Sequence, residues 1–240
     1  MSDAGSGERI EAYRAARAAV LERIASASRR AERDPATVTL VAVSKTIEAG
    51  AVRDAVAAGL DVLGENRVQE AAAKVPAVAG ARWHLVGPLQ ANKTRRAIEL
   101  FDVIESVDSV GLAERIDRLA REIRPGARYP ILLQVNVDAD PAKAGFEPSA
   151  LEPSVTRIAE LDGLELAGLM TIGRLVTEPE AARPTFRRLR ELSVQLRDAG
   201  LPIGPGLSMG MTDDFEIAVE EGATFVRVGR ALFGERHHPD

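Results

Sequence analysis

The sequence predicts an α/β protein that folds as a single (β/α)₈ TIM barrel with an extra helix at its N-terminus. Short apolar runs alternate with amphipathic segments along the chain, a pattern typical of βα units in a parallel sheet. Eight such units in about 200 residues match the size of a (β/α)₈ barrel. A doubly wound open sheet shares the alternation and is the rival architecture. No linker, repeat or low-complexity tract divides residues 1–240, so we expect one domain.

The first predicted element is a helix over residues 9–33. Ile10, Tyr13 and Val20 recur at helical spacing, and charged residues cover the other face. Proline disfavours the helical conformation of the residue before it, so Asp34-Pro35 is expected to end this helix. Residues 1–8 lack the basic and apolar blocks of a signal peptide and are expected to form a disordered tail.

The strands and helices that follow are predicted from apolar runs and from helical spacing. The strongest strand pattern is YPILLQVNV, and glycine or proline ends the first two of the helices that follow strands. Strands are predicted at 38–43, 61–63, 82–86, 103–107, 129–137, 164–169, 206–209 and 224–228. Helices are predicted at 49–58, 68–75, 90–100, 110–123, 150–161, 180–199 and 213–221, with a last helical turn that reaches Phe233.

The composition excludes several classes of function. The chain has no cysteine, which excludes disulfides, thiolate nucleophiles and cysteine-ligated metals. It has only 3 histidines, so no metal site is expected. A net charge of −5 argues against general nucleic-acid binding. No apolar stretch approaches the ~20 residues of a membrane span. We therefore expect a soluble cytoplasmic protein.

Amine chemistry has four candidates, because the other basic residues are arginines, which stay protonated. Lys45 follows the first strand, and barrel active sites lie at the carboxyl ends of strands. Partial desolvation there favours an uncharged amine that can form a Schiff base. Alternatively, Lys45 reaches solvent or pairs with Asp61 or Glu65. Lys74 and Lys93 are expected to be surface or phosphate-contact residues, and Lys143 lies on a long loop.

The segments after the last two strands have the features of a phosphate site. Ser208 and Thr212 supply hydroxyl groups after the seventh strand, and Gly229 and Arg230 follow the eighth. Barrels often bind phosphate at these positions through backbone N–H groups. The alternative is that these residues are the turn glycines and caps that any βα loop needs.

Three further side chains are candidates for the same site. Arg227 shares a strand face with Gly229, so it contacts a ligand or pairs with a glutamate, for which Glu65, Glu216 and Glu220 are the candidates. His84 lies in the third strand as a core residue or a pocket residue. Asn66 caps the following helix or faces the pocket.

Seven ordered motifs resemble the single-domain pyridoxal 5′-phosphate (PLP) homeostasis proteins, which are relatives of the alanine racemase N-terminal barrel in PLP fold type III. These motifs are VAVSKT at 41–46, GENRVQE at 64–70, WHLVGPLQANK at 83–93, VNVDADPAKAGF at 135–146, GLMTIG at 168–173, LSMGMTDDFEIAV at 207–219 and GATFVRVGRALFGER at 222–236. The resemblance covers almost the whole chain after residue 8.

The resemblance implies a role for each candidate residue. Lys45 would hold PLP as an internal aldimine, and Arg227 would face the pyridine nitrogen and keep it unprotonated. Asn66 and His84 would line the ring pocket. The residues that would hold the phosphate are Ser208, Thr212, Gly229 and Arg230. Many relatives have a second lysine two positions after the first; Ile47 stands there in this chain, which puts any role of that lysine in doubt.

Two functions fit such a barrel. The first is a carrier that buffers PLP and passes it to apo-enzymes without substrate turnover. The second is an amino-acid racemase, which in this fold uses a tyrosine from a second domain. The chain has 2 tyrosines, Tyr13 and Tyr129, both predicted far from the rim, and only His84 or Lys143 could replace them as a base. The carrier is favoured, and a monomer is expected. A third possibility, an aldolase-type barrel enzyme that uses the amine of Lys45, is weaker because it gives Arg227 no role.

Overall fold

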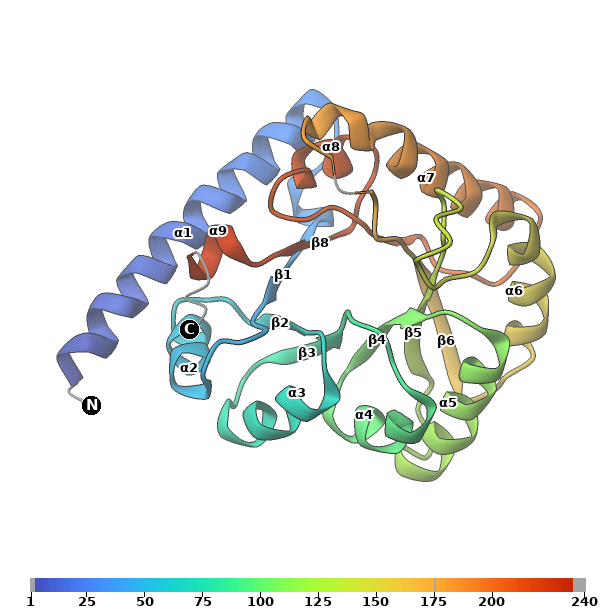
Figure 1. Ribbon diagram of the computed structural model, residues 1–240, viewed down its shortest axis with the longest axis horizontal. Coiled ribbons are helices and arrows are strands. Elements are labelled where there is room, and N and C mark those ends of the chain that lie inside the picture. The colour runs from blue at the N-terminus through green and yellow to red at the C-terminus, as the bar shows by residue number, and fades with distance from the viewer. Residues whose placement is uncertain (1–2, 175, 235–240) are drawn as a thin grey trace.

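The computed structural model describes residues 3–174 and 176–234 (Figure 1). Eight parallel strands follow one another around a closed barrel, and helices surround it. The barrel confirms the predicted fold and excludes the open sheet. Helix α1 lies on the outside, where it packs against α2, α8 and α9 (Figure 1).

The observed elements follow the predicted order. The strands are β1 (Thr39–Val43), β2 (Val62–Glu65), β3 (Arg82–Leu85), β4 (Val103–Val107), β5 (Tyr129–Gln134), β6 (Leu164–Met170), β7 (Gly206–Ser208) and β8 (Phe225–Val228). The α-helices are α1 (Asp3–Arg30), α2 (Ala49–Ala57), α3 (Val68–Lys74), α4 (Thr94–Leu100), α5 (Val110–Ile123), α6 (Leu151–Ala159), α7 (Arg183–Asp198), α8 (Phe215–Glu220) and α9 (Arg230–Phe233). Short 3-10 turns precede α4, α6 and α7.

The N-terminal helix begins earlier than predicted. Helix α1 starts at Asp3, so the expectation of a disordered tail is wrong for residues 3–8, and residues 1–2 lie outside the described part. Two side chains anchor the first turns to α2. Ser6 donates a hydrogen bond to Asp54 at 2.7 Å, and Arg9 donates one at 2.6 Å. These contacts offset the weak helix propensity of two glycines.

Alternate residues of each strand face two different cores. Outward residues such as Leu63, Leu85 and Ile104 pack against the helices. Inward residues such as Val103 and Met170 form a small apolar cluster inside the barrel. Residues beyond that cluster on the same faces reach the carboxyl ends of the strands, which is where barrels build their sites.

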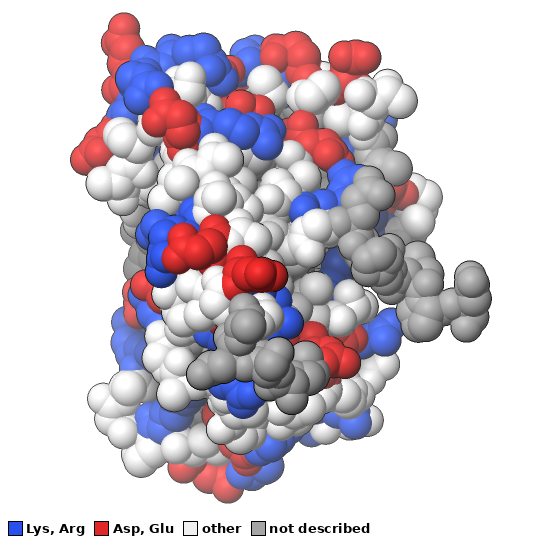
Figure 2. Space-filling model, turned by 90° about the vertical axis from the view of Figure 1, so that its left-hand side faces the viewer, with Lys and Arg blue, Asp and Glu red and all other residues white. Residues whose placement is uncertain are grey.

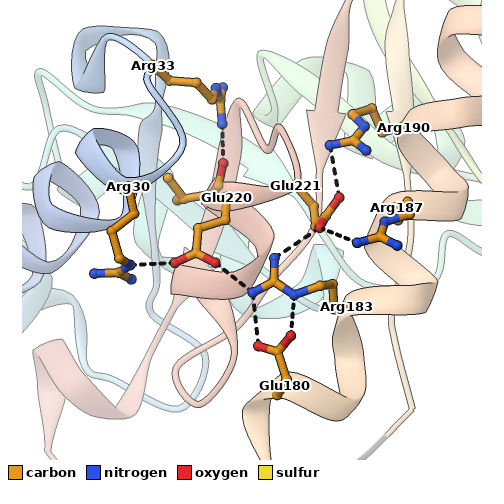
Figure 3. A network of polar contacts seen from close by, with 9 residues as sticks. Arg30, Arg33, Glu180, Arg183, Arg187, Arg190, Glu220 and Glu221 are labelled. Atoms are coloured by element: carbon orange, nitrogen blue, oxygen red, sulfur yellow. Dashed lines mark hydrogen bonds and ion pairs between the residues drawn. The ribbon is translucent and has the colours of Figure 1, made fainter.

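An ion-pair network fastens α8 to its neighbours (Figure 3). Glu220 pairs with Arg30 of α1 and with Arg183 of α7, both at 2.6 Å. The buried Glu221 contacts three guanidinium groups from α7, those of Arg183, Arg187 and Arg190. The network therefore holds the carboxyl end of α8, the helix that follows the loop after β7.

The surface on the side of α1 carries acidic and basic side chains interspersed with uncharged ones (Figure 2). Within residues 3–174 and 176–234, no helix is long and apolar enough to cross a membrane.

Candidate site at the barrel mouth

Lys45 lies on a tight turn directly after β1. The N–H of Ile47 donates to the carbonyl of Ser44 at 3.0 Å and closes this turn. Thr46 has a φ of 68°, a left-handed conformation that is uncommon for a β-branched residue. The side chain of Lys45 is half-buried. The turn therefore places Lys45 directly beyond the carboxyl end of β1, as predicted from its position in the sequence.

A buried polar network crosses the barrel interior below this mouth. Nδ1 of His84 lies 2.6 Å from Oε1 of Glu105, and the hydroxyl of Ser208 donates to Oε2 of the same carboxylate at 2.5 Å. Arg227 donates from Nη1 to the Ser208 hydroxyl at 2.6 Å and from Nη2 to the carbonyl of Thr171 at 2.8 Å. The network joins β3, β4, β7 and β8 through side chains at most 5% exposed.

Glu105 is the centre of this network, and the sequence reasoning missed it. Burial alone would raise the pKa of Glu105, but the hydrogen bond and charge of His84 and the charge of Arg227 outweigh burial and lower it. Burial lowers the pKa of Arg227, and the charges of Glu105 and Asp214 oppose that effect. The sequence feature that could have identified Glu105 is a charged residue inside the apolar run VIESV.

His84 is only partly satisfied by the protein. Its Nδ1 is bound to Glu105, while its buried Nε2 makes no hydrogen bond to any described residue. Its ring lies beside that of Phe225, with the centroids 5.8 Å apart. A buried ring nitrogen without a partner is unusual and favours a pocket role over a purely structural one.

The predicted phosphate residues gather between β7 and β8, with one exception. The N–H of Gly229 lies 3.4 Å from the hydroxyl of Thr212, which brings the two loops together. The exposed side chain of Arg230 pairs with Asp213, so only its backbone is available to the loop. Ser208 differs, because its hydroxyl is bound in the interior network.

The loop after β7 depends on Gly210. Its φ is 89°, and a Cβ atom there would lie 2.5 Å from Cβ of Ala218 and 2.9 Å from Cα of Phe215. Only glycine permits this close approach between the loop and α8. The loop that carries Thr212 is therefore packed directly onto the helix that the ion-pair network holds.

Several alternatives from the sequence are wrong. Lys74 is not a surface residue, because its buried amine pairs with Glu65 at 2.7 Å. Asn66 does not cap α3, since Arg67 occupies the N-cap position. Asn66 lies half-buried, directly before that position.

Arg227 also has different partners from those considered. The three glutamates proposed for it bind elsewhere, Glu65 to Lys74, Glu216 to Arg23 and Glu220 to Arg30 and Arg183. Glu105, reached through the Ser208 hydroxyl, is the carboxylate nearest to it in the network. Closure of the barrel brings β4 opposite β7 and β8, which the strand pattern alone does not reveal.

The two tyrosines and Lys143, which were weighed for the racemase, have partners in the described structure. The ring of Tyr13 packs on Phe233, with the centroids 5.4 Å apart. Tyr129 begins β5 and donates from its hydroxyl to the carbonyl of Phe101 at 2.7 Å. The amine of Lys143 donates to the carbonyls of Ile172 and Gly173 at 3.3 and 2.9 Å. Both tyrosines thus lie away from the mouth, as predicted.

A cleft of about 290 Å³ opens at the mouth between the loops after β3, β5 and β6. Its lining includes Pro88, Gln134, Asn136, Lys143 and Ile172. Across the part of the chain that the structure describes, histidine, aspartate and glutamate residues form no cluster that could hold a metal ion.

Comparison with known proteins places this site in a family. The sequence model described as "Alanine racemase, N-terminal domain" matches residues 16–237. The pyridoxal phosphate homeostasis protein of Pseudomonas aeruginosa is 46% identical over 225 residues, which cover 92% of this chain and 94% of that protein.

Two solved structures share the fold over nearly the whole chain. An unknown protein from Bifidobacterium adolescentis superimposes with a TM-score of 0.87 at 37% identity, covering 97% of each chain. PipY of Synechococcus elongatus PCC7942, solved with PLP bound, has a TM-score of 0.77 at 42% identity and covers 90% of this chain and 100% of its own.

Fold and sequence together define a barrel of the alanine racemase N-terminal class. Within that class, the chain belongs to the family of pyridoxal phosphate homeostasis proteins. This confirms the family resemblance carried by the seven motifs.

Proposed function

We propose that this protein binds PLP covalently through Lys45 and acts in PLP homeostasis and delivery without turning over a substrate. The observation that carries the proposal is the pairing of two neighbouring strands. Val41 of β1 lies opposite Arg227 of β8, and Lys45 follows Val41 by four residues, at most about 13 Å of extended chain. A pyridine ring held between the Lys45 amine and the Arg227 guanidinium would fit within that distance.

The residues at the mouth fit the chemical groups of PLP. Lys45 would hold the cofactor through a C=N bond between its Nζ and the aldehyde carbon, formed with loss of water. Thr212 and the backbone of Gly229 and Arg230 would hold the phosphate. Nε2 of His84, which has no hydrogen-bond partner among the described residues, and the amide of Asn66 would line the ring pocket.

Arg227 supports a carrier rather than an enzyme. When bound, PLP supplies an electron-withdrawing ring whose power depends on protonation of the ring nitrogen. A guanidinium cannot accept a proton and disfavours a second positive charge beside it. Arg227 would therefore keep the nitrogen unprotonated and the ring a poor electron sink. The relatives' name, pyridoxal phosphate homeostasis protein, agrees with this role.

The racemase remains the second candidate function, and the engaged side chains count against it. A racemase needs a second base opposite the lysine. Lys143 is bound to two carbonyls and the two tyrosines pack elsewhere. His84 keeps an unbonded Nε2, with its Nδ1 on Glu105, and is therefore the candidate base that the racemase test addresses. Incubation of PLP-loaded protein with single enantiomers of common amino acids should give no racemisation; turnover of any of them would contradict the carrier.

Binding itself is tested by titrating the protein with PLP and recording visible absorption. Wild type should develop the band of a lysine-bound cofactor, and Lys45→Ala should lose it. Lys93→Ala is the matched control and should keep the band. A wild-type protein without the band would contradict the proposal.

The cellular role is proposed on the relatives' name. We propose that the protein works in the cytoplasm as a monomer and passes PLP to apo PLP-dependent enzymes. Reactivation of a purified apo-enzyme by the PLP-loaded protein, faster than by released PLP, would support delivery. Sedimentation at micromolar concentration would reveal a dimer if the monomer assignment is wrong.

A further inference from the structure

The turn that carries Lys45 is bonded on both sides by one helix, α3. The amine of Lys74, at the end of this helix, donates to the carbonyl of Ser44 at 2.7 Å. Glu70, one turn earlier, accepts a hydrogen bond from the N–H of Thr46 at 3.1 Å. The residues directly before and after Lys45 are therefore each held by a charged side chain of α3.

Lys74 is fixed in place by a buried ion pair. Its side chain is 8% exposed and that of Glu65 is 0% exposed, and their charged atoms lie 2.7 Å apart. The hydroxyl of Ser44 donates to the same carboxylate oxygen at 2.7 Å. Burying two charges is costly, and apolar residues often stabilise a fold equally well at such positions. Stability alone therefore does not account for the buried Lys74–Glu65 pair.

The strained conformation of Thr46 provides a reason for the Lys74–Glu65 pair. A positive φ at a β-branched residue is unfavourable and persists only when its surroundings enforce it. The contacts from Glu70 and Lys74 lie on either side of Lys45, and the one from Glu70 is made to the N–H of the strained residue itself. Release of Thr46 to a negative φ would change the direction of the chain at Lys45.

We propose that Lys74 and Glu70 are positioning residues that hold the strained turn and aim the amine of Lys45 into the barrel mouth. This inference rests on the proposed binding of PLP at Lys45. The two residues touch the backbone on either side of Lys45, so they act on bond formation through its geometry.

The first experiment compares the rate at which the C=N bond forms when PLP is mixed with each variant. Glu70→Ala should form the bond about tenfold more slowly than wild type, because the lysine is misplaced. Gln69→Ala, on the exposed face of α3, is the matched control and should react at the wild-type rate. Adding Thr46→Gly to Glu70→Ala should restore most of the rate, since glycine adopts a positive φ without strain.

The second experiment removes the buried pair. Lys74→Met leaves a buried carboxylate unpaired and can unfold the protein, so the double variant Lys74→Met with Glu65→Leu replaces both charges by apolar groups. This variant should keep the circular dichroism spectrum of wild type and form the bond about tenfold more slowly.

Amide hydrogen exchange supplies a readout that needs no PLP. Exchange at Thr46 should be faster in Glu70→Ala than in wild type, and unchanged in Gln69→Ala. Wild-type rates of bond formation in Glu70→Ala and in the double variant, or no rescue by Thr46→Gly, would overturn the positioning role alone. A wild-type protein that forms no bond at Lys45 would instead contradict the proposed function.

Discussion

The carboxylate of Glu105 on β4 binds the hydroxyl of Ser208 on β7 across the inside of the barrel, at 2.5 Å. The two residues are 103 positions apart in the chain. Through Ser208 the carboxylate is linked to the guanidinium of Arg227, and its other oxygen contacts His84. One buried anion thus links His84 and Arg227, two of the side chains expected to contact the cofactor ring.

Replacement of Glu105 should destabilise the fold. Glu105→Gln leaves the guanidinium of Arg227 buried without its carboxylate, so we expect a loss of about 3–5 kcal/mol in the free energy of unfolding. Urea denaturation measures this loss. Glu99→Gln on α4 removes a half-exposed partner of Arg96 and should cost no more than about 0.5 kcal/mol. Equal losses in the two variants would show that the network contributes little.

The same carboxylate should make stability depend on acid pH. Its folded-state pKa is lowered, so its contribution is complete above the unfolded pKa of about 4.3 and is lost as the pH falls through the folded pKa. The difference in unfolding free energy between wild type and Glu105→Gln should be constant from neutral pH to about pH 5 and shrink below about pH 4. A difference that grows on acidification would contradict the lowered pKa.

Arg227 should control the affinity and the spectrum of bound PLP. Arg227→Gln removes the cation expected to face the ring nitrogen, so we expect affinity to fall about tenfold and the absorption band to change its position or pH dependence. Titration with PLP from pH 6 to 9 measures both, and Arg95→Gln on the outer surface is the control. An unchanged band and affinity in Arg227→Gln would remove this residue from the ring site.

Gly210 should be required for packing of the phosphate loop. Gly210→Ala adds a strained φ and a methyl group 2.5 Å from Cβ of Ala218, so we expect it to cost about 2–4 kcal/mol and to weaken PLP binding. Gly80→Ala is the matched control, because Gly80 has a φ of 81° but no neighbouring atom within 4 Å. It should cost only about 1 kcal/mol. Similar losses in the free energy of unfolding for Gly210→Ala and Gly80→Ala would show that the positive φ alone causes the effect.

Local patterns predicted most of the fold. Strand β4 and helix α5 have the predicted bounds, because an apolar run and an amphipathic helix capped by Ser109 are signals within one segment. The predicted strand 129–137 ends three residues early, at Gln134. Beyond it the backbone N–H of Asn136 donates to the carbonyl of Phe146 in an isolated bridge, and the Asn136 side chain bonds the backbone of Asp140.

The features of the site that depend only on a residue's position along a strand were predicted from the sequence. The sequence places Lys45 after β1 and Arg227 on the inward face of β8 without knowledge of their partners. The roles of Glu105 and Lys74 were not predicted, because they depend on contacts between different βα units. Barrel closure and helix packing decide which buried charges meet, and neither has a local sequence signature.

Reduction with borohydride can locate the lysine that carries PLP. Borohydride converts the C=N bond into a stable amine, and peptide mass spectrometry then locates the added pyridoxyl group. We predict modification of Lys45, with Lys74, Lys93 and Lys143 unmodified at stoichiometric PLP. Modification of another lysine in place of Lys45, or no modification at all, would rule out covalent binding of PLP at Lys45.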